Sequence, residues 1–557
     1  MRIHEHTQPS LILHNGRVHT VDDGDEVVSA VALAGDRILA TGEDGEVLAL
    51  AGPKTEKRDA RGRSVIPGII DSHNHAWEAG RLMQGVVTFG LQSIEELKQK
   101  LKDRARELPP GSWLQGGGWI ETQFEERRMP NRWDLDEAVP EHPVVVERIF
   151  STSVANSAAL EIAGITRDTP DPEAGEIERH PETGEPTGVL HRSAKMLVRR
   201  HIPFGDDASG LTEGAAEAIF RASREYLRWG ITSIVEPGVT PSLARAYQDL
   251  WQKGELPLRV CLMPNWYGFE LEHDEDRMDG VTEALGIYTG IGDEWLRLGA
   301  LKMAVDGGLT SKTALLSWPY LGENRPREVP LRLELSRLKG LVLRAHKAGW
   351  SVGIHVVGDV SQDAAVEAIW EACQADPRPH RHQVIHGYYP TQESLQRMAE
   401  AEIIAAVQPS FTYGEADGYS DLLSRDKQES FLPLKRYLEA GVCVAISTDM
   451  PSAHYNPFWG LYSAVTRRGL AGYSLGDAEC INVEQGLRMM TLNSAYLTGE
   501  EDIKGSLEPG KLADLAVLDR DLAETPPETI RDTVVDLTVI GGRVVFDRNK
   551  EGSRPTR

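Results

Sequence analysis

The chain has 557 residues, of which 40% are hydrophobic and 26% charged, and it carries a formal net charge of −25 at pH 7. This length exceeds what one hydrophobic core usually covers, and the composition is that of a folded globular chain rather than a disordered one. The negative charge is spread along the sequence, which argues against partners such as nucleic acid or an anionic membrane surface.

The cysteines Cys261, Cys373, Cys443 and Cys480 lie far apart and form no CxxC pair. This spacing favours neither a disulfide framework nor a structural zinc site, and it fits a reducing compartment. The amino terminus lacks the basic start and apolar core of a signal peptide, and no apolar run is long enough to span a bilayer. We therefore expect a cytoplasmic protein without a membrane partner, and the sequence leaves open whether it forms a homo-oligomer.

Short β-rich runs alternate with turns over residues 10–66, as in SLILHNGRVHTV and VVSAVALAGDRILATG. The same character returns near the carboxyl terminus in KLADLAVLDRD and VVDLTVIGGRVVF. We predict one small β-sandwich domain assembled from both termini, residues 1–66 and 500–557.

Residues 210–499 alternate apolar runs with helical segments, which is the signature of a parallel α/β architecture. An earlier run, VIPGIID, supplies the first expected strand. We assign residues 67–84 to this first part of the barrel. The others are ITSIVEP, LRVCLMP, GALKMAV, SVGIHVV, HQVIHGY, IIAAVQP and VCVAIST. Eight parallel strands fit a closed (β/α)8 TIM-like barrel, whose active site lies at the carboxyl ends of the strands.

Residues 85–209 are too many for a single crossover helix between the first two barrel strands, so an insertion is expected. A lid over the barrel mouth and a purely packing role are equally compatible with its sequence. Among the aromatic residues of the chain, Trp119, Trp318 and Tyr413 are candidates to line a substrate pocket, with packing as the alternative for each.

Polar residues stand at the carboxyl ends of most expected barrel strands. They are His73 and His75 on the first strand, Glu236 on the second, Lys302 on the fourth, His355 on the fifth, His386 on the sixth and Asp449 on the eighth. Alternate residues of a strand share a face, so the first two imidazoles suit a divalent metal, although two histidines hydrogen-bonded in a loop are the alternative. Histidines without a shared role would have no reason to recur at the carboxyl ends of successive strands. We therefore predict that the polar residues converge on one rim.

The motifs PGIIDSHNH and STDMP, with single histidines on the fifth and sixth strands, resemble the amidohydrolase superfamily of metal-dependent hydrolases. LKMAVDGGLTSKTALL, NSAALEIAGIT, TGEPTGVL and GSLEPGKLADLAVLD are similar to its amidohydrolase type 3 branch, which includes N-substituted formamide deformylases. The likeness extends from about residue 10 to residue 548.

This resemblance implies a set of ligands for one or two metal ions: His73, His75, Lys302, His355, His386 and Asp449. Lys302 stands where relatives carry a lysine carboxylated by carbon dioxide, with a salt-bridged lysine as the alternative. The nitrogen and oxygen donors suit zinc first, and manganese, nickel, cobalt or iron are compatible. Asp449 would be the catalytic residue that accepts the proton of the attacking water.

The expected activity is hydrolysis of a small-molecule N-substituted amide, an N-formyl or N-acyl compound, at its C–N bond. A metal lowers the pKa of water toward ~7, so hydroxide is available at neutral pH, and Asp449 would pass the proton to the leaving amine. The same barrel supports hydrolysis of cyclic amides, carbamates or esters, and deamination. A non-catalytic binding protein is a further alternative, which the presence of Asp449 disfavours.

Three positions depart from the branch pattern. Ser151 stands where a histidine is common, Arg192 where an acidic residue is customary, and Ile385 where a glutamate often precedes the histidine of the sixth strand. These changes spare the expected ligands but touch expected pocket positions, so the substrate of a relative does not transfer to this chain.

Overall fold

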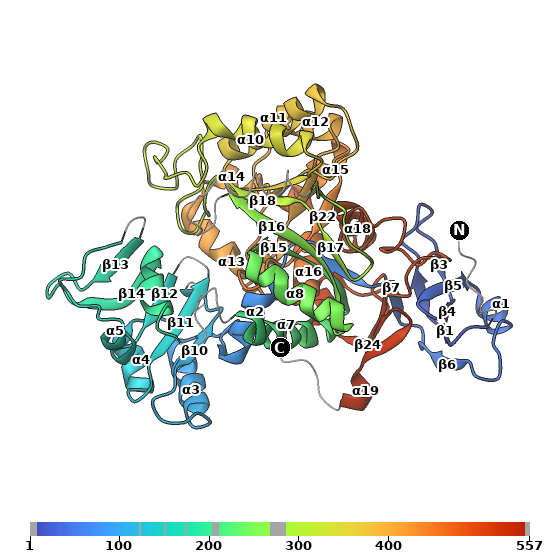
Figure 1. The fold of residues 1–557 in the computed structure, drawn as a ribbon, viewed down its shortest axis with the longest axis horizontal. Helices are drawn as coiled ribbons and strands as arrows, with labels where there is room; N and C mark the ends of the chain where they lie inside the picture. Colours follow the sequence, from blue (N-terminus) through green and yellow to red (C-terminus); the bar gives the residue numbers. More distant parts are fainter. Residues whose placement is uncertain are drawn as a thin grey trace.

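The computed structural model describes residues 8–121, 124–149, 152–172, 175–202, 211–267 and 286–551. Figure 1 shows a central barrel with a small β structure on one side and a separate α/β unit on the other. The barrel positions the candidate site, and the two flanking parts cover its sides.

The barrel consists of eight parallel strands, as the sequence predicts. In chain order they are β8 (Ile69–Asp71), β15 (Ile231–Val239), β16 (Arg259–Tyr267), β18 (Leu301–Ala304), β19 (Val352–Val356), β20 (Gln383–His386), β21 (Ile404–Val407) and β22 (Val444–Ile446). A short extra strand, β17 (Leu296–Leu298), pairs with β16. The first and last barrel strands meet beyond their ends, where Ser72 Oγ donates to the carbonyl of Ile446 at 3.0 Å and the Asp449 amide donates to the carbonyl of His73 at 2.9 Å.

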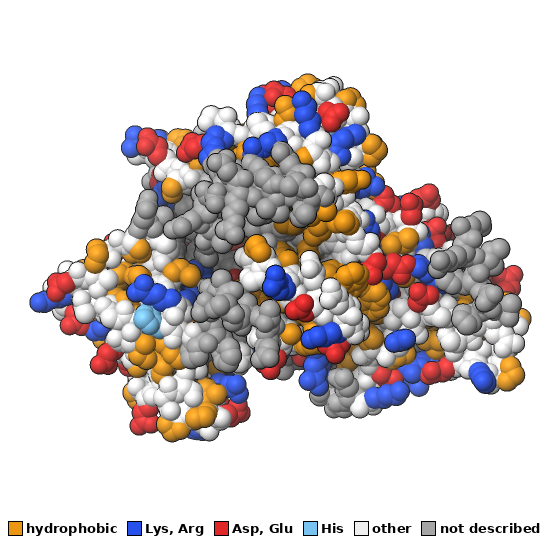
Figure 2. Space-filling model, viewed as in Figure 1, with side chains coloured by type: hydrophobic (Ala, Val, Ile, Leu, Met, Phe, Trp, Pro, Cys, Tyr) orange, Lys and Arg blue, Asp and Glu red, His pale blue; other side chains and the backbone are white. Residues whose placement is uncertain are grey.

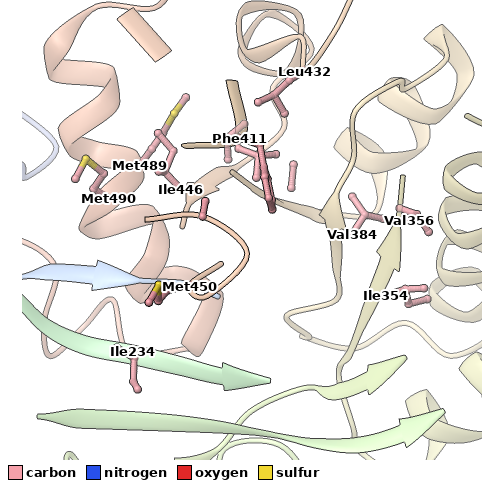
Figure 3. Packing of buried hydrophobic residues seen from close by; sticks show 14 of the residues in the cluster. Ile234, Ile354, Val356, Val384, Phe411, Leu432, Ile446, Met450, Met489 and Met490 are labelled. Carbon is pink, nitrogen blue, oxygen red and sulfur yellow. The ribbon is translucent and has the colours of Figure 1, made fainter. Parts of the chain in front are cut away.

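Helices surround the barrel and bury the outward apolar side chains of its strands. They are α2 (Ala76–Gln84), α7 (Leu211–Leu227), α8 (Pro241–Lys253), α10 (Leu335–Lys347), α11 (Asp359–Ala375), α12 (Gln392–Glu400), α13 (Pro409–Leu422), α14 (Arg425–Glu429), α15 (Leu434–Glu439), α16 (Pro457–Thr466), α17 (Val483–Met490) and α18 (Leu492–Thr498). Figure 3 shows part of this core, in which Ile354, Val384 and Ile446 of the strands and Met489 of α17 are all buried. Such burial is the main stabilising contribution to the barrel.

The small β structure contains two sheets that draw on both ends of the chain. One has the order β5-β4-β1-β6, and the other the order β25-β24-β23-β7-β2-β3. Their bounds are β1 (Leu11–His14), β2 (Arg17–His19), β3 (Val27–Val28), β4 (Ala30–Ala34), β5 (Arg37–Gly42), β6 (Glu56–Asp59), β7 (Ser64–Pro67), β23 (Leu515–Leu518), β24 (Val535–Ile540) and β25 (Arg543–Asp547), with the short helices α1 (Asp44–Leu48) and α19 (Arg548–Glu551). The predicted β-sandwich built from both termini is confirmed.

The sequence run VIPGIID does not form one strand, and this corrects the prediction. Its first half, in β7, pairs with β23 of the small sheet, whereas its second half is the barrel strand β8, which pairs with β15. The switch occurs at Gly68, where a Cβ atom would lie 2.2 Å from Oγ1 of Thr232. Because both halves are apolar and buried, hydrophobicity alone cannot reveal that they belong to different sheets.

The insertion after the first barrel strand forms its own sheet with the order β13-β14-β12-β11-β10-β9. The strands are β9 (Val86–Val87), β10 (Leu114–Gly117), β11 (Val144–Ile149), β12 (Thr152–Ala155), β13 (Gly175–Arg179) and β14 (Pro186–Arg192), and the helices are α3 (Ile94–Ala105), α4 (Arg132–Ala138), α5 (Ser157–Ile162) and α6 (Met196–Arg199). Two separate hydrophobic clusters lie within it. The expected insertion is confirmed, while its exact limits and its role as a lid stay predictions.

The surface carries acidic and basic side chains intermixed across the face shown in Figure 2. Within the described residues, none of the helices combines the length and hydrophobicity that crossing a membrane requires.

Candidate metal centre

The predicted polar residues lie together at the carboxyl end of the barrel. The ring centroids of His355 and His386 are 4.4 Å apart, those of His73 and His75 are 5.5 Å apart, and those of His73 and His386 are 6.1 Å apart. Asp449 completes the group, because its Oδ1 lies 3.4 Å from Nε2 of His75 and 3.8 Å from Nε2 of His73.

The two histidines of the HxH motif reach the site differently from what the sequence suggests. Strand β8 ends at Asp71, so His73 lies in the following turn and His75 is the N-cap residue of α2. Glu236 fixes the start of this helix, because its Oε2 accepts hydrogen bonds from the amide of Ala76 at 2.9 Å and from the hydroxyl of Tyr247 at 2.6 Å. The imidazoles therefore converge through a helix start rather than through strand alternation.

The other two histidines each have one ring nitrogen committed to a hydrogen bond. His386 Nδ1 donates to the side-chain oxygen of Gln408 at 2.6 Å, and His355 Nε2 donates to the carbonyl of Gly307 at 3.1 Å. Burial lowers the pKa of His386 to about 4 and holds the pKa of His355 well below its usual value. Both rings are thus neutral at pH 7, and the remaining nitrogen of each keeps the lone pair that a metal requires.

Lys302 lies on the fourth barrel strand with its Nζ 3.2 Å from Nε2 of His73. Burial lowers the pKa of this amine to about 7, and the charge of Asp449 opposes that shift only in part. A substantial fraction of Lys302 is therefore uncharged at neutral pH, which is unusual for a lysine.

A carboxylate outside the predicted set holds the turn that carries Asp449. Asp71 accepts hydrogen bonds from the amide of Thr448 at 2.9 Å, from its hydroxyl at 2.5 Å and from the side-chain nitrogen of Asn74 at 2.8 Å. These contacts join the end of the first barrel strand to the end of the eighth. They also fix the separation between the histidine pair and Asp449.

The residues present fit a divalent metal ion. The potential ligand atoms of His73, His75 and Asp449 all lie within 4.8 Å of one another. Nδ1 of His73 is buried and has no hydrogen-bond partner among the described residues, where the basic nitrogen nearest to the buried Oδ1 of Asp449 is Nε2 of His75 at 3.4 Å. Buried polar atoms normally have a partner, and two imidazoles and a carboxylate are the donors that zinc and related ions prefer.

The three aromatic candidates lie in different surroundings. Trp119 is buried in a hydrophobic cluster of the insertion, with its ring stacked 6.0 Å from that of Phe124. Trp318 is half-buried, with its ring 5.1 Å from that of Tyr389. Tyr413 lies on α13 and stacks on Trp459 at 4.7 Å. Their contact with substrate stays a prediction.

A second group of potential ligand atoms, from His346, Cys373 and His382, lies at the opposite end of the barrel, before β20. The amide of Val352 donates to His382 Nδ1 at 2.9 Å, so the proton of this ring is on Nε2, which donates to His346 Nδ1 at 2.8 Å. His346 Nε2 in turn donates to the carbonyl of Asp376 at 2.7 Å. Every nitrogen of the two rings is used, and we interpret the group as a structural hydrogen-bond chain.

Of the three departures from the branch pattern, Ile385 is fully buried among apolar side chains of the barrel interior. Ser151 and the side chain of Arg192 lie outside the described residues. Sequence reasoning missed Gln408 and Asp71, although the position of each at the end of a barrel strand was a usable signal.

Comparison with known proteins gives the family. A model of the amidohydrolase family matches residues 56–546. The chain belongs to the amidohydrolase family. This amidohydrolase is 29% identical over 547 residues to N-substituted formamide deformylase of Arthrobacter pascens. The alignment covers 97% of this chain and 98% of the relative.

Two solved structures share the fold over nearly the whole amidohydrolase chain. A metal-dependent hydrolase of Pyrococcus furiosus is 25% identical, with a TM-score of 0.70 over 92% of this chain and 100% of that one. A metal-dependent hydrolase of Pyrococcus horikoshii is 24% identical, with a TM-score of 0.71 over 93% of this chain and 99% of that one. The amidohydrolase is a metal-dependent hydrolase of C–N bonds by its family, and the expected type 3 resemblance is confirmed.

Proposed function

We propose that this amidohydrolase cleaves the C–N bond of an N-substituted amide, an N-formyl or N-acyl compound, with water as the second substrate. The observation that supports this most strongly is the gathering of four imidazoles, Lys302 and Asp449 at one barrel rim. The similarity to a formamide deformylase over 97% of the chain supports the amide substrate.

The proposed ligands are His73, His75, His355, His386 and Asp449. A divalent ion held there, for which zinc suits the donors best, would supply Lewis-acid chemistry and lower the pKa of a bound water. The hydrogen bonds to Gln408 and Gly307 orient two of the imidazoles, and burial keeps both rings neutral by lowering their pKa.

Asp449 is the proposed proton carrier. Its carboxylate is buried beside both histidines of the HxH motif, and the Asp71 and Thr448 contacts hold the adjoining backbone in place. It would accept a proton from the attacking water and deliver it to the leaving nitrogen, which departs as an amine.

We further propose that Lys302 is carboxylated on Nζ. Only a neutral amine reacts with carbon dioxide, and burial supplies one by lowering the pKa of Lys302 to about 7. The reaction joins Nζ of the neutral amine to the carbon of carbon dioxide and releases one proton, which leaves an anionic ligand with two oxygens. Such a ligand suits a site that holds two metal ions.

The experiment is a substrate screen with zinc-loaded and manganese-loaded protein. The panel contains N-formyl, N-acetyl and aryl amides, together with lactams, carbamates, esters and aromatic amines that a deaminase would accept. We expect turnover of linear N-substituted amides. Turnover confined to another class would replace the proposal with that activity, and no turnover by metal-loaded protein would favour a binding protein.

Elemental analysis of gently purified protein tests the metal independently. We expect one to two divalent ions per chain, and a chelator should remove both ions and activity. Full activity with less than a tenth of an equivalent of metal would contradict the proposed ligand set. A cytoplasmic location and a homo-oligomeric state stay predictions.

A further inference from the structure

One buried carboxyl group near the candidate metal centre has no part in the proposed chemistry. Glu415 lies on α13, directly after the seventh barrel strand, and is only 3% exposed. The side chains of Thr310 and Tyr419 lie beside its carboxyl group, and Oε2 is buried and has no hydrogen-bond partner among the described residues. An unsatisfied buried carboxyl oxygen is costly, so its position suggests that a ligand supplies the missing donor.

The surroundings of Glu415 belong to the mouth of the barrel. Thr310 follows the strand that carries Lys302, and Tyr388 follows the strand that ends at His386. The ring of Tyr388 lies 5.9 Å from the ring of His386, and its hydroxyl interacts electrostatically with both Glu415 and Asp449. Glu415 is therefore separated from the proposed metal ligands by about one side chain.

Among the described residues, Glu415 shares a neighbouring cation with a second carboxylate. The cation beside it is Arg148 of the insertion strand β11, and this guanidinium is bound by Glu121, with Nε to Oε2 at 2.5 Å and Nη2 to Oε1 at 3.0 Å. Two carboxylates thus share one guanidinium. Burial raises the pKa of Glu415 to about 7, with Arg148 opposing this shift and Glu121 adding to it.

The walls next to Glu415 are aromatic. Tyr388 and Tyr419 both lie beside its carboxyl group, and each ring also packs against Phe431, at 4.7 Å and 5.0 Å. Aromatic faces attract organic cations, and a buried carboxylate supplies the counter-charge. A divalent metal would require more free oxygen ligands than this group offers, because Arg148 occupies both oxygens of Glu121.

We propose that Glu415 binds a protonated amine carried by the substrate, so that it selects amides with an ammonium group on their N-substituent. The inference rests on the proposed function. The ammonium group would donate to Oε2 of Glu415, contact the rings of Tyr388 and Tyr419 and cancel the excess negative charge. Glu415 is thus a specificity-determining residue.

The kinetic experiment compares matched formamides. N-formyl-1,5-diaminopentane carries a terminal ammonium group, and N-hexylformamide carries a methyl group at the same place. Wild-type enzyme should favour the first by about tenfold or more in kcat/KM, which is the value of one charged hydrogen bond. In Glu415→Gln the ratio should fall toward one, because only the substrate with the ammonium group loses a contact.

Asp421→Asn is the matched control, because it removes an exposed carboxylate from the same helix. This variant should keep the wild-type ratio of kcat/KM between the two formamides. Glu415→Asp retains the charge on a shorter side chain and should shift the preferred diamine to one methylene longer. A wild-type preference for N-hexylformamide, or a ratio unchanged in both Glu415 variants, would overturn the proposal.

Calorimetry with 1,5-diaminopentane separates this inference from the proposed function, because it requires no turnover. The zinc-loaded wild type and Asp421→Asn should bind the diamine at least about tenfold more tightly than Glu415→Gln. If no amide is hydrolysed but this difference is present, the proposed function fails and the amine site stands. Equal affinities in all three proteins would refute the amine site.

Discussion

Two residues of the candidate centre hold backbone conformations that side chains other than glycine rarely adopt. The φ angles of Asp449 and His386 are 55° and 75°. Each is held by its neighbours, since the Asp449 amide donates to the carbonyl of His73 and His386 donates to Gln408. Strained residues cluster at functional sites, where the surrounding contacts offset the cost. We interpret both conformations as a requirement of ligand placement.

Asp449→Asn tests the role of the carboxylate in proton transfer. Asparagine has nearly the same shape, so we expect the fold and much of the metal to remain while kcat falls by ~10²–10⁴, the range typical of a lost general base. Steady-state kinetics with the best substrate of the screen, together with elemental analysis, measure both effects. More than a third of wild-type kcat in this variant would remove Asp449 from the mechanism.

Lys302→Ala tests the proposed carboxylation. The variant should lose at least one metal ion and most of its activity, and short carboxylic acids should partly restore both by occupying the vacated space. A crystal structure of the wild type at neutral pH should show the added carboxylate on Nζ. A bare Lys302 directed away from fully occupied metal ions would leave a mononuclear site.

The sequence predicted the residues of this centre better than the contacts that hold them. The convergence of these residues on one rim was predictable because barrel geometry brings strand ends together, whereas their role as metal ligands was implied by the family resemblance and stays a prediction. Gln408, Asp71 and Glu415 escaped notice because their roles depend on contacts with residues far away in the chain, such as the one between Asp71 and Thr448. A residue type at a strand end does not reveal its partner.

At the scale of elements, a single carboxylate ties two barrel loops together. Asp306, which follows β18, accepts hydrogen bonds from the amides of Leu315 at 2.9 Å, Val357 at 3.0 Å and Gly358 at 2.8 Å, and from the hydroxyl of Ser361 at 2.7 Å. It therefore joins the loop after the lysine strand to the start of α11. His355 lies at the end of the strand between them.

Asp306→Ala should destabilise the fold, because it leaves two buried amides and one partly buried amide without an acceptor. At ~1–3 kcal/mol for each unsatisfied group, we expect the free energy of unfolding to fall by about 3 kcal/mol or more. Asp359→Ala is the control, since Asp359 holds the same pair of loops through the exposed Ser317 and should cost no more than ~1 kcal/mol. Chemical denaturation measures both, and equal losses would contradict this account.

The histidine chain beneath the barrel predicts sensitivity to acid. His380 lies beside this chain, with its ring centroid 4.3 Å from that of His382. Burial, followed by the charges of neighbouring His346 and Arg378, lowers the pKa of His380 to about 4, and burial also holds the pKa of His382 well below 6.5. Between pH 6.5 and about pH 4 the unfolded chain therefore binds more protons than the folded one. This contribution to stability is complete above pH 6.5 and is lost as the pH falls toward 4.

We therefore expect the melting temperature of metal-free protein to fall between pH 7 and pH 5. Metal-free His380→Gln should show a smaller fall over the same interval, because one of the groups responsible is gone. Thermal scans at both pH values measure the difference. A variant with the same fall as the wild type, or a wild type more stable at pH 5, would contradict the prediction.

Among the elements, strand positions in the barrel were predictable because each apolar run of suitable length is followed by a polar strand end. The split of VIPGIID was not predictable, because β7 and β8 are equally apolar and only their partners differ. The helical placement of His75 was likewise hidden, since the sequence after Asp71 carries no strong stop signal.

At the scale of the whole molecule, a buried ion pair joins the barrel to the small β structure. Arg259 at the start of β16 donates from Nε and Nη2 to the carboxylate of Asp514, at 2.6 Å and 3.0 Å. The two side chains are 2% and 5% exposed. Asp514 directly precedes β23, so the pair fixes the small sheet against the barrel.

Arg259→Leu should therefore reduce the free energy of unfolding by about 3–5 kcal/mol, because it leaves the charge of Asp514 buried without its partner. The double variant Arg259→Leu/Asp514→Asn should recover part of this loss, as it removes the stranded charge. Arg425→Ala is the control, because it breaks an exposed pair with Glu429 and should change stability by no more than ~1 kcal/mol. Chemical denaturation of the three variants measures these changes in the free energy of unfolding.

The order in which the chain is synthesised gives the pairing of β7 with β23 a further consequence. Ile66 pairs with Ala516, so a strand made early acquires its neighbour only when the chain is almost finished. At the ~5–20 residues per second of ribosomal synthesis, this wait lasts roughly 20 to 90 seconds. During that time β7 presents an apolar strand edge, and such edges promote association between chains. The amino-terminal strands therefore expose an unpaired edge during synthesis, and the small β structure can be completed only after the barrel has been synthesised.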